Sequence, residues 1–439
     1  MLTPTPPRPG APAADRALAL RGVRALDEAG GFSDALDVVV SDGTIEAVAV
    51  NAAAPPGALE VDCAGLWLMP GVVDCHVHVA ASSNDTLENL ATPLSLRALQ
   101  AGRNLETMLA AGVTHARDAG GADAGLRTAV ARGLVAGPAL DVSIAMLSQT
   151  GGHADGFLAG AGIAIAVEDL MPAAPGRPPF IVDGAEQMRA VVREVLRAGA
   201  DWIKLCTTGG AFAGADAYTE TQLSVEEVSV AVAEAARRGR GVMAHAVGSA
   251  GIDIALDAGV RSIEHGVYLT EAQAVRMAAA GVFLVPTLAI YRWVIETVVE
   301  GQPDRFPAEV RAGAAQIGSV LGAAVAIAHA HGVPIALGSD ITTAAGHGGN
   351  LAEITWLHRA GLAVEDALLA ATLRGAQLCG VAGRSGRIEP GHAFDAILLD
   401  EDPGDLSCFL RRDAVSGVFR GGVAVVEHAR LADAGRVPG

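Results

Sequence analysis

The sequence contains few cysteines, and none of them has the spacing of a metal-binding or redox motif. Only five occur in 439 residues; they are scattered, and no two form a CxxC motif. An odd number of scattered thiols is typical of a reducing compartment, so we expect a cytoplasmic location and no disulfide framework. Ordinary packing is the preferred interpretation even for the two that neighbour candidate site residues. The five are Cys63, Cys75, Cys206, Cys379 and Cys408.

The chain also lacks the features of secreted, membrane-spanning and nucleic-acid-binding proteins. Its N-terminus has no basic start followed by an apolar core, and residues 1–15, rich in Pro and Ala, are interpreted as a disordered leader. No run of about 18 uninterrupted apolar residues occurs, so no membrane span is predicted. The net charge of −18 argues against nucleic acid and anionic membrane surfaces as partners.

Short alternating segments separated by turn residues occur at both ends of the chain. Between residues 16 and 68 they include DALDVVVSDGTIEAVAV, in which Asp42 and Gly43 mark a hairpin turn. Residues 386–439 repeat this pattern in GRIEPGHAFDAILLD and AVSGVFRGGVAVVE. Both segments are predicted to be all-β, and we expect them to meet in one small β-sandwich domain.

The central region, residues 69–385, has a different pattern. Eight apolar, strand-like runs alternate with Ala- and Leu-rich helical stretches such as AEQMRAVVREVLRAGA. Eight strand–helix units of this length are what a parallel (β/α)8 TIM barrel requires, so the predicted fold class is α/β. One long connection, residues 150–183, is rich in Gly and Pro, and loops of that length are often functional.

Two histidines stand one residue apart in the first apolar run of this region, MPGVVDCHVHVA. Side chains two residues apart on a strand point to the same face, so His76 and His78 can converge on one ion. A lone buried histidine is more often an inert, hydrogen-bonded core residue, but two unpaired imidazoles would be costly to bury. The pair therefore predicts a metal site, provided that other strands supply further ligands.

Further candidate ligands fall at the ends of later strands, which is where a (β/α)8 barrel carries its functional side chains. Each candidate has an ordinary alternative, since Lys204 could form a structural ion pair and Asp340 could cap a helix. Four imidazoles and an oxygen donor suit Zn²⁺ or a similar metal ion, whereas a lysine is no ligand while it is an ammonium ion. The candidates from strands 4, 5, 6 and 8 are Lys204, His245, His265 and Asp340.

These residues resemble the ligand set of the amidohydrolase superfamily. The segments DCHVH, DWIKLCTTGG, MAHAVG, SIEHG and GSD match that superfamily in order, spacing and barrel position, and the resemblance covers nearly the whole chain. In members with this strand-4 lysine, CO₂ carboxylates the lysine, which then bridges two divalent metal ions. The resemblance implies the same for Lys204, with Zn²⁺ as the default metal. The other ligands that it implies are His76, His78 and Asp340 for one ion and His245 and His265 for the second.

A narrower resemblance concerns the substrate. THARDAGG, GGHADG, IKLCTTGG and HGGNLAEI are similar to the Xaa-Pro dipeptidase-like and imidazolonepropionase-like amidohydrolases, a group that includes ochratoxin-type amidases. The resemblance implies cleavage of the C–N amide bond of a dipeptide or an N-acyl amino acid by a metal-bridging hydroxide. A hydrophobic C-terminal residue is favoured, and an ochratoxin-type amide is a further candidate.

The ligand set has two other interpretations. A cyclic-amide hydrolase of the imidazolonepropionase type uses a single metal ion and lacks the strand-4 lysine as a ligand, so Lys204 favours a dipeptidase or amidase. A non-catalytic member of the superfamily would have lost ligands, and all six positions are filled here.

The resemblance also implies roles for residues around the metal ions. Asp340 is expected to take the water proton and pass it to the leaving amine. His153 is expected to stabilise the carbonyl or tetrahedral oxyanion, with a loop-stabilising hydrogen bond as the alternative. Tyr218 is a candidate for binding the substrate α-carboxylate. His347 is a candidate for the pocket mouth, with a surface position as the slightly preferred alternative.

Four more residues near strand ends are given structural interpretations. Arg117 and Asp118 close strand 2 and are expected to form an ion pair beneath the site. Arg292 and Trp293 follow strand 7, and an exposed helix start is preferred over a place in the leaving-group pocket. The expected partner is thus a small-molecule substrate, and because superfamily members often assemble, we also expect a homo-oligomer.

Overall fold

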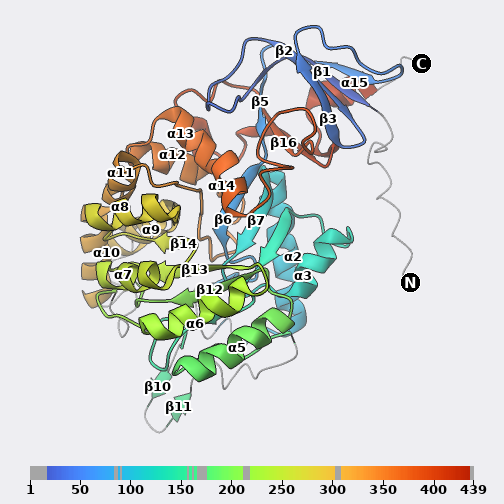
Figure 1. Cartoon of the computed structure of the whole chain (residues 1–439). Helices are drawn as coiled ribbons and strands as arrows, with labels where there is room; N and C mark the ends of the chain where they lie inside the picture. The colour runs from blue at the N-terminus through green and yellow to red at the C-terminus, as the bar shows by residue number, and fades with distance from the viewer. Residues whose placement is uncertain are drawn as a thin grey trace.

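A computed structural model of the chain describes most of its residues (Figure 1). The described ranges are residues 17–83, 88, 91–155, 158–160, 163–165, 176–210, 218–301 and 308–435. The predicted leader, residues 1–15, lies outside them. Of the long connection 150–183, the structure describes both ends and a short antiparallel pair, β10 (Leu158–Gly160) and β11 (Ile163–Ile165).

Parallel strands form two adjoining sheets in the central region. The first has the order β6-β7-β8, and the second has the order β15-β14-β13-β12-β9. Strand β9 follows β8 after Ile144, whose φ of +67° interrupts the extended chain. The strands and their bounds are β6 (Val72–Val77), β7 (Val113–Asp118), β8 (Ala139–Val142), β9 (Met146–Leu147), β12 (Trp202–Cys206), β13 (Gly241–Ala246), β14 (Ser262–His265) and β15 (Phe283–Val285).

Backbone hydrogen bonds join the two sheets into a closed circle. The N–H of Asp201, just before β12, donates to the carbonyl oxygen of Val142 over 2.7 Å. The N–H of Ala336 donates to the carbonyl of Leu284 in β15, so the chain around residues 334–337 occupies the eighth position. From there the carbonyl of Leu337 accepts the N–H of Cys75 in β6 over 2.8 Å. The predicted (β/α)8 barrel is therefore formed.

Helices surround the barrel and bury one face each. In α5 (Ala185–Arg197) the buried residues recur at intervals of three and four, the pattern of an amphipathic helix; they are Met188, Val191, Val192 and Val195. The other α-helices of the central region are α2 (Leu94–Ala110), α3 (Ala124–Ala131), α6 (Val225–Ala236), α7 (Ser249–Ala258), α8 (Glu271–Ala280), α9 (Leu288–Val294), α10 (Ala308–Val320), α11 (Ala323–Ala330), α12 (Ala352–Arg359), α13 (Val364–Ala371) and α14 (Leu373–Leu378), the last three of which follow the eighth barrel segment.

One helical stretch has the length and composition of a membrane span. Val310–Ala330 has a mean hydropathy of 1.5 and comprises most of α10 and all of α11. The two helices are separated at Gly322, where φ is +92°. Residues of α11 such as Val325 are buried in the barrel core. Core helices pass the same length and composition test, so a single stretch of this kind is weak evidence for a membrane.

The two ends of the chain form one sheet beyond one end of the barrel, at the top of Figure 1. Its order is β18-β17-β16-β5-β1-β2-β3, with β4 paired to β1. Because the described strands form a single hydrogen-bonded path, the predicted packing of two sheets in a sandwich stays a prediction, as do the domain boundaries. The strands are β1 (Leu18–Ala25), β2 (Leu36–Ser41), β3 (Thr44–Ala49), β4 (Leu59–Asp62), β5 (Trp67–Pro70), β16 (Ala396–Leu399), β17 (Val415–Arg420) and β18 (Val423–Val426).

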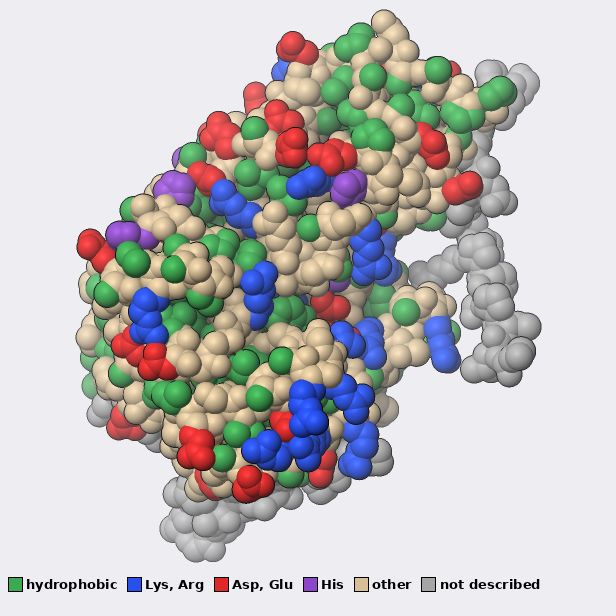
Figure 2. All heavy atoms as spheres, viewed as in Figure 1, with side chains coloured by type: hydrophobic (Ala, Val, Ile, Leu, Met, Phe, Trp, Pro, Cys, Tyr) green, Lys and Arg blue, Asp and Glu red, His purple; other side chains and the backbone are tan. Residues whose placement is uncertain are grey.

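Charged side chains of both signs are scattered over the face shown in Figure 2, and Lys/Arg-type side chains gather over α5 and the end of α6. The carboxylate of Glu234 lies among these arginines and pairs with Arg193 over 2.8 Å. A basic patch with a buried carboxylate at its centre is a weak electrostatic footprint for nucleic acid. The prediction that nucleic acid is no partner therefore stands as a prediction.

Candidate active site and metal centre

Residues from the first and last strand positions of the barrel meet where these strands end. His76 lies near the end of β6 and His78 just beyond it, with ring centroids 5.5 Å apart. Oδ1 of Asp340 lies 3.2 Å from Nε2 of His78 and 3.5 Å from Nε2 of His76. The N–H of Asp340 donates to the carbonyl oxygen of His76, which ties the two strand ends together. The structure thus brings three of the candidate ligands together.

Histidines from β13 and β14 lie beside this group. The ring centroid of His265 is 5.1 Å from that of His76 and 4.5 Å from that of His245. His265 and Asp340 have φ angles of +72° and +52°, in a left-handed region that costs a non-glycine residue about 1–3 kcal/mol. Such strain persists only where the surrounding structure imposes it, and it gathers at functional sites. Its presence at two facing strand ends supports a functional role for this cluster.

Each of the four histidines has one ring nitrogen held by a neighbouring group. Nδ1 of His76 lies 2.7 Å from Oε2 of Glu264, and Nδ1 of His78 lies 2.9 Å from the carbonyl oxygen of Gly120. Partners of this kind fix the orientation of metal-binding histidines and leave the other nitrogen to bind the ion. The other two pairs are His265 Nδ1 with Thr287 Oγ1 at 2.7 Å and His245 Nε2 with the Gly209 carbonyl at 3.2 Å.

Lys204 lies on β12 and is the only lysine in the chain. Its side chain is 1% exposed, and its Nζ has no hydrogen-bond partner among the described residues. Burial lowers the pKa of its amine. After burial, the charge of Lys204 is the next largest cause of the low pKa of His76, which places the amine close to the histidine cluster. Burying an ammonium ion without a partner is costly, so the surroundings disfavour the charged form of this amine.

The donor set fits divalent metal ions. One donor atom each from His76, His265 and Asp340 lies within 4.8 Å of the other two. Burial holds the pKa of His76 and His245 well below the ordinary value and lowers that of His265 to about 3, so the imidazoles are neutral, the form that binds metal. Burial raises the pKa of Asp340, but His76 and His78 outweigh it and hold that pKa below its ordinary value.

A buried ion pair supports His76 from the barrel interior. Nη2 of Arg117 donates to Oε1 of Glu264 over 2.9 Å, and both side chains are fully buried. The guanidinium of Arg117 also lies 4.7 Å from the ring centroid of Trp202. The predicted pair of Arg117 with Asp118 is wrong, because neighbours on a strand point to opposite faces. The carboxylate of Asp118 instead accepts the backbone N–H groups of Val79, Gly120 and Ala122.

Glu264→Gln is expected to weaken metal binding about 10–100-fold, because the amide keeps the size of the side chain but loses the charge that orients His76. The measurement is the metal affinity of the variant in competition with a chelator. Glu234→Gln, which removes a carboxylate from the arginine cluster outside the barrel, is the matched control and should leave that affinity unchanged. Equal affinities in both variants would show that Glu264 does not position His76.

His153 stacks on a candidate ligand. Its ring lies parallel to that of His245, with centroids 4.2 Å apart and 19° between the planes. Its backbone N–H donates to Oε1 of Gln222 over 2.9 Å, which fixes the loop after β9. The loop is therefore held by the backbone of His153 while its imidazole lies beside the cluster, where a role in oxyanion stabilisation stays a prediction.

The three tyrosines of the chain gather beside the site. The rings of Tyr218 and Tyr268 are stacked, with centroids 5.1 Å apart, and their hydroxyl oxygens lie 3.3 Å apart. Tyr291, in α9, packs edge-on against His265 with centroids 5.8 Å apart. Tyr291 was not a candidate from the sequence, because its position in an apolar helical run resembles that of a core residue. The role predicted for Tyr218 stays a prediction.

The motif HGGNLAEI fixes loops around the site with buried polar side chains. His347 is 0% exposed, so the slightly preferred surface position is wrong; its Nε2 lies 3.3 Å from the carbonyl oxygen of Ala81. The amide of Asn350 donates to Asp74 over 2.9 Å, just before His76 in the chain. The carboxylate of Glu353 accepts the first N–H groups of α9. A place for His347 in substrate binding stays a prediction.

A small, mostly apolar cavity of about 170 Å³ lies between α9 and the loop after Asp340. Arg292 borders it, and this guanidinium lies 5.1 Å from the ring centroid of Trp356 and pairs with Glu296 over 3.1 Å. Nε of Arg292 is buried without a hydrogen-bond partner among the described residues. The expected exposed position at a helix start therefore holds for Trp293, which is 43% exposed, better than it holds for Arg292.

Comparisons with known proteins agree with this geometry. Residues 67–425 match the model of the amidohydrolase family. An ochratoxinase of Aspergillus niger is 35% identical over 366 residues, which cover 81% of this chain and 75% of that protein. The crystal structure of A. niger ochratoxinase has a TM-score of 0.81 at 30% identity and covers 94% of this chain and 97% of that one. A crystal structure of a prolidase complexed with N-methylphosphonate-L-proline has a TM-score of 0.84 at 33% identity, covering 94% and 100%.

The matched residues include the whole barrel and every candidate ligand. Enzymes of this family are generally metal-dependent and act on small molecules, in agreement with the group of donor atoms at the barrel end. The chain therefore belongs to the amidohydrolase family and is a hydrolase that acts on C–N bonds.

Proposed function

We propose that this protein is a two-metal amidohydrolase that cleaves the amide bond of dipeptides or N-acyl amino acids, with a preference for a hydrophobic C-terminal residue. The observation that carries the proposal is the buried Nζ of Lys204, which has no partner among the described residues and lies close to the neutral imidazoles of His76, His245 and His265. A free ammonium ion has no favourable place there, whereas a carboxylated lysine would serve as an anionic ligand.

The lysine acquires that charge from CO₂. The neutral amine of Lys204 adds to the carbon of CO₂ and releases one proton, which leaves a carbamate anion. The low pKa that burial gives this amine favours the neutral form that reacts. When bound, two divalent ions, most simply Zn²⁺, would polarise the amide carbonyl and lower the pKa of a water molecule. His76, His78 and Asp340 would hold one ion, His245 and His265 the other, and the carbamate both.

The proton transfer belongs to Asp340. Its ionised carboxylate lies within 3.5 Å of two imidazoles, so it can accept a proton from the attacking water and later donate it to the leaving amine. The ring of His153, stacked on His245, would donate to the oxyanion that forms when the amide carbonyl is attacked. The two residues thus divide proton transfer and charge stabilisation between them.

The cavity beside α9 supports a hydrophobic substrate side chain. It is bordered by Ile290, Trp293, Ile341 and Trp356, and Ile341 directly follows Asp340. The guanidinium of Arg292, which borders the same cavity, would supply a donor for a substrate carboxylate. The likeness to an ochratoxinase and to a prolidase supports N-acyl amino acids and dipeptides as the class to test. We also propose a homo-oligomer in the cytoplasm, in keeping with five free cysteines.

The test is a panel of Xaa-hydrophobic, Xaa-Pro and Xaa-basic dipeptides, N-acyl amino acids and ochratoxin A, with amino-acid release as the readout. We expect release that is strongest for hydrophobic C-terminal residues, lost with a chelator and restored by Zn²⁺. Preference for Xaa-Arg or Xaa-Lys would contradict the proposed specificity. Absence of release from every member of the panel by the metal-loaded enzyme would contradict the proposed reaction.

A further inference from the structure

A second cluster of ionisable side chains lies nearer the starts of the strands than the candidate active site does. His115 and Asp141 occupy the third positions of β7 and β8, and Cys379 directly follows α14. One donor atom of each lies within 4.8 Å of the other two. We propose that these three residues bind a zinc ion, or a similar thiolate-binding divalent ion, at a site separate from the catalytic metals. The proposal does not depend on the proposed reaction.

The donor types are those of a zinc site, and the spacing of His115 and Asp141 is close to the tetrahedral value. Thiolate, imidazole and carboxylate are the ligands of protein-bound zinc, with bonds of about 2.0–2.3 Å. Nε2 of His115 lies 3.2 Å from Oδ2 of Asp141, and Sγ of Cys379 lies 3.9 Å from Sγ of Cys75. Tetrahedral bonds of that length separate the ligand atoms by about 3.3–3.8 Å. The sulfur of Cys75 lies against that of Cys379, beside the three proposed ligands.

The cluster already holds one positive charge between two anionic groups. The hydrogen bond from Cys75, with help from His115, lowers the pKa of Cys379 to about 6. Burial lowers the pKa of His115, but Asp141 and Cys379 outweigh it and raise that pKa to about 10. The imidazolium thus occupies the place of a cation between two anions, and binding of zinc releases its proton to solvent.

The surroundings suit a structural ion. Burial raises the pKa of Asp141, but His115 and Trp202 both lower that pKa, which keeps the carboxylate ionised. The nearest buried cation, Arg117, is neutralised by Glu264. Apolar side chains of the barrel floor, among them Val73 and Phe283, pack around the sulfur atoms. An ion at this place would fasten the segment after α14, which leads to the terminal sheet, to the first strands of the barrel.

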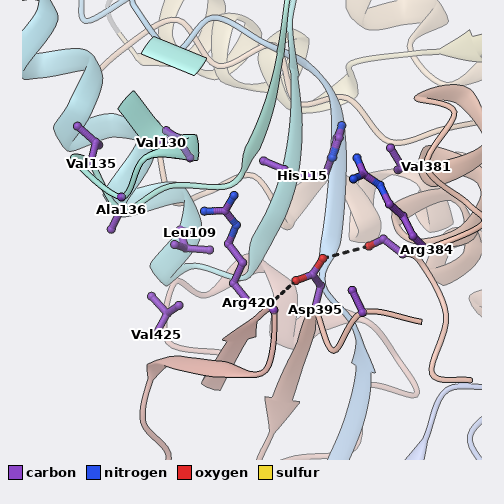
Figure 3. A pocket seen from close by; sticks show the side chains of 15 residues that line it. Leu109, His115, Val130, Val135, Ala136, Val381, Arg384, Asp395, Arg420 and Val425 are labelled. Atoms are coloured by element: carbon purple, nitrogen blue, oxygen red, sulfur yellow. Dashed lines mark hydrogen bonds between the residues drawn. The ribbon is translucent and has the colours of Figure 1, made fainter. Parts of the chain in front are cut away.

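A cavity gives access to this cluster. It has a volume of about 540 Å³ and lies between the barrel and the terminal sheet, with His115 on its inner side. Figure 3 shows His115 together with Arg384, Asp395 and Arg420 around this cavity, where the carboxylate of Asp395 hydrogen-bonds Ser385 and the backbone N–H of Gly421. The positive charges of the two arginines disfavour a free cation at the rim. The carboxylates of Asp395 and, further in, Asp141 offset part of that positive charge.

Cobalt is the probe, because a thiolate bound to Co²⁺ gives a charge-transfer absorption that nitrogen and oxygen ligands do not give. Metal-free enzyme, with its thiols kept reduced, is titrated with Co²⁺ and its near-ultraviolet spectrum recorded. We expect a thiolate band in the unaltered enzyme, no band in Cys379→Ala, and an unchanged band in the control Cys408→Ala. Asp141→Asn, which keeps the size of the side chain, should raise the Co²⁺ concentration needed for the band about 10–100-fold.

The active-site ligands include no sulfur, so this band reports on the second cluster whether or not the enzyme cleaves an amide. Absence of the band from the unaltered enzyme at saturating Co²⁺ would overturn the proposal, because it would leave the cluster as a hydrogen-bonded ion pair. A band that survives Cys379→Ala would overturn it as well, since another thiol would then be the ligand.

Discussion

Lys204→Ala is expected to lower kcat/KM on the order of 10³-fold, which corresponds to an activation free energy raised by several kcal/mol. The variant removes the proposed shared ligand of both catalytic metals. Without the carbamate, the two divalent cations would have four neutral imidazoles as ligands and only one anionic ligand, the carboxylate of Asp340. The variant should therefore bind its metals weakly as well as turn over slowly. The measurements are steady-state kinetics on the best substrate of the panel and metal content by elemental analysis.

The single lysine makes the chemistry behind this expectation directly visible. Enzyme equilibrated with ¹³C-labelled bicarbonate should give one carbamate resonance, and Lys204→Ala should give none. Short carboxylic acids that enter the space left by the side chain should restore part of the lost activity. Full activity with unchanged metal content in Lys204→Ala would show that Lys204 does not bridge the catalytic metal ions.

Asp340→Asn is expected to lower kcat about 10²–10⁴-fold, the usual contribution of a general base and acid. The amide keeps an oxygen donor for the metal but can neither take a proton from water nor return it to the leaving amine. KM should change much less than kcat, because the carboxylate acts on the reacting proton. Kinetics over a series of substrate concentrations separate the two parameters.

Asp400→Asn is the matched control for that experiment. Asp400 is an exposed carboxylate that pairs with His428 over 2.8 Å in the terminal sheet, far along the chain from the site. Its loss should leave kcat unchanged. If Asp340→Asn kept its kcat while retaining metal, proton transfer would have to be assigned to another residue.

The barrel and the place of its candidate ligands could be predicted because local patterns determine them. Each strand is a short apolar run, and the alternation of side chains on a strand brings His76 and His78 to one side. Parallel strands of a barrel end at one face, so polar residues at the ends of distant runs gather without further information. That is why His265 and Asp340 could be named from the sequence.

The partners of these residues could not be predicted, because they depend on contacts between distant parts of the chain. Glu264 directly precedes His265, and nothing in its own strand indicates that it holds His76 from across the barrel. Tyr291 resembles a core residue of a helix until α9 is placed against His265. Arg117 is different: strand alternation alone argues against its pairing with Asp118, and the expected pair overlooked that rule.

The most direct test of the central claim counts the metal ions that activity requires. Metal-free Cys379→Ala, in which the thiolate cluster cannot compete, is titrated with Zn²⁺ in the presence of bicarbonate while amino-acid release is followed. Our expectation is that activity rises until two equivalents of Zn²⁺ are bound per chain. A plateau at one equivalent would contradict it, because a single catalytic ion is the arrangement of a cyclic-amide hydrolase and leaves Lys204 without a bridging role.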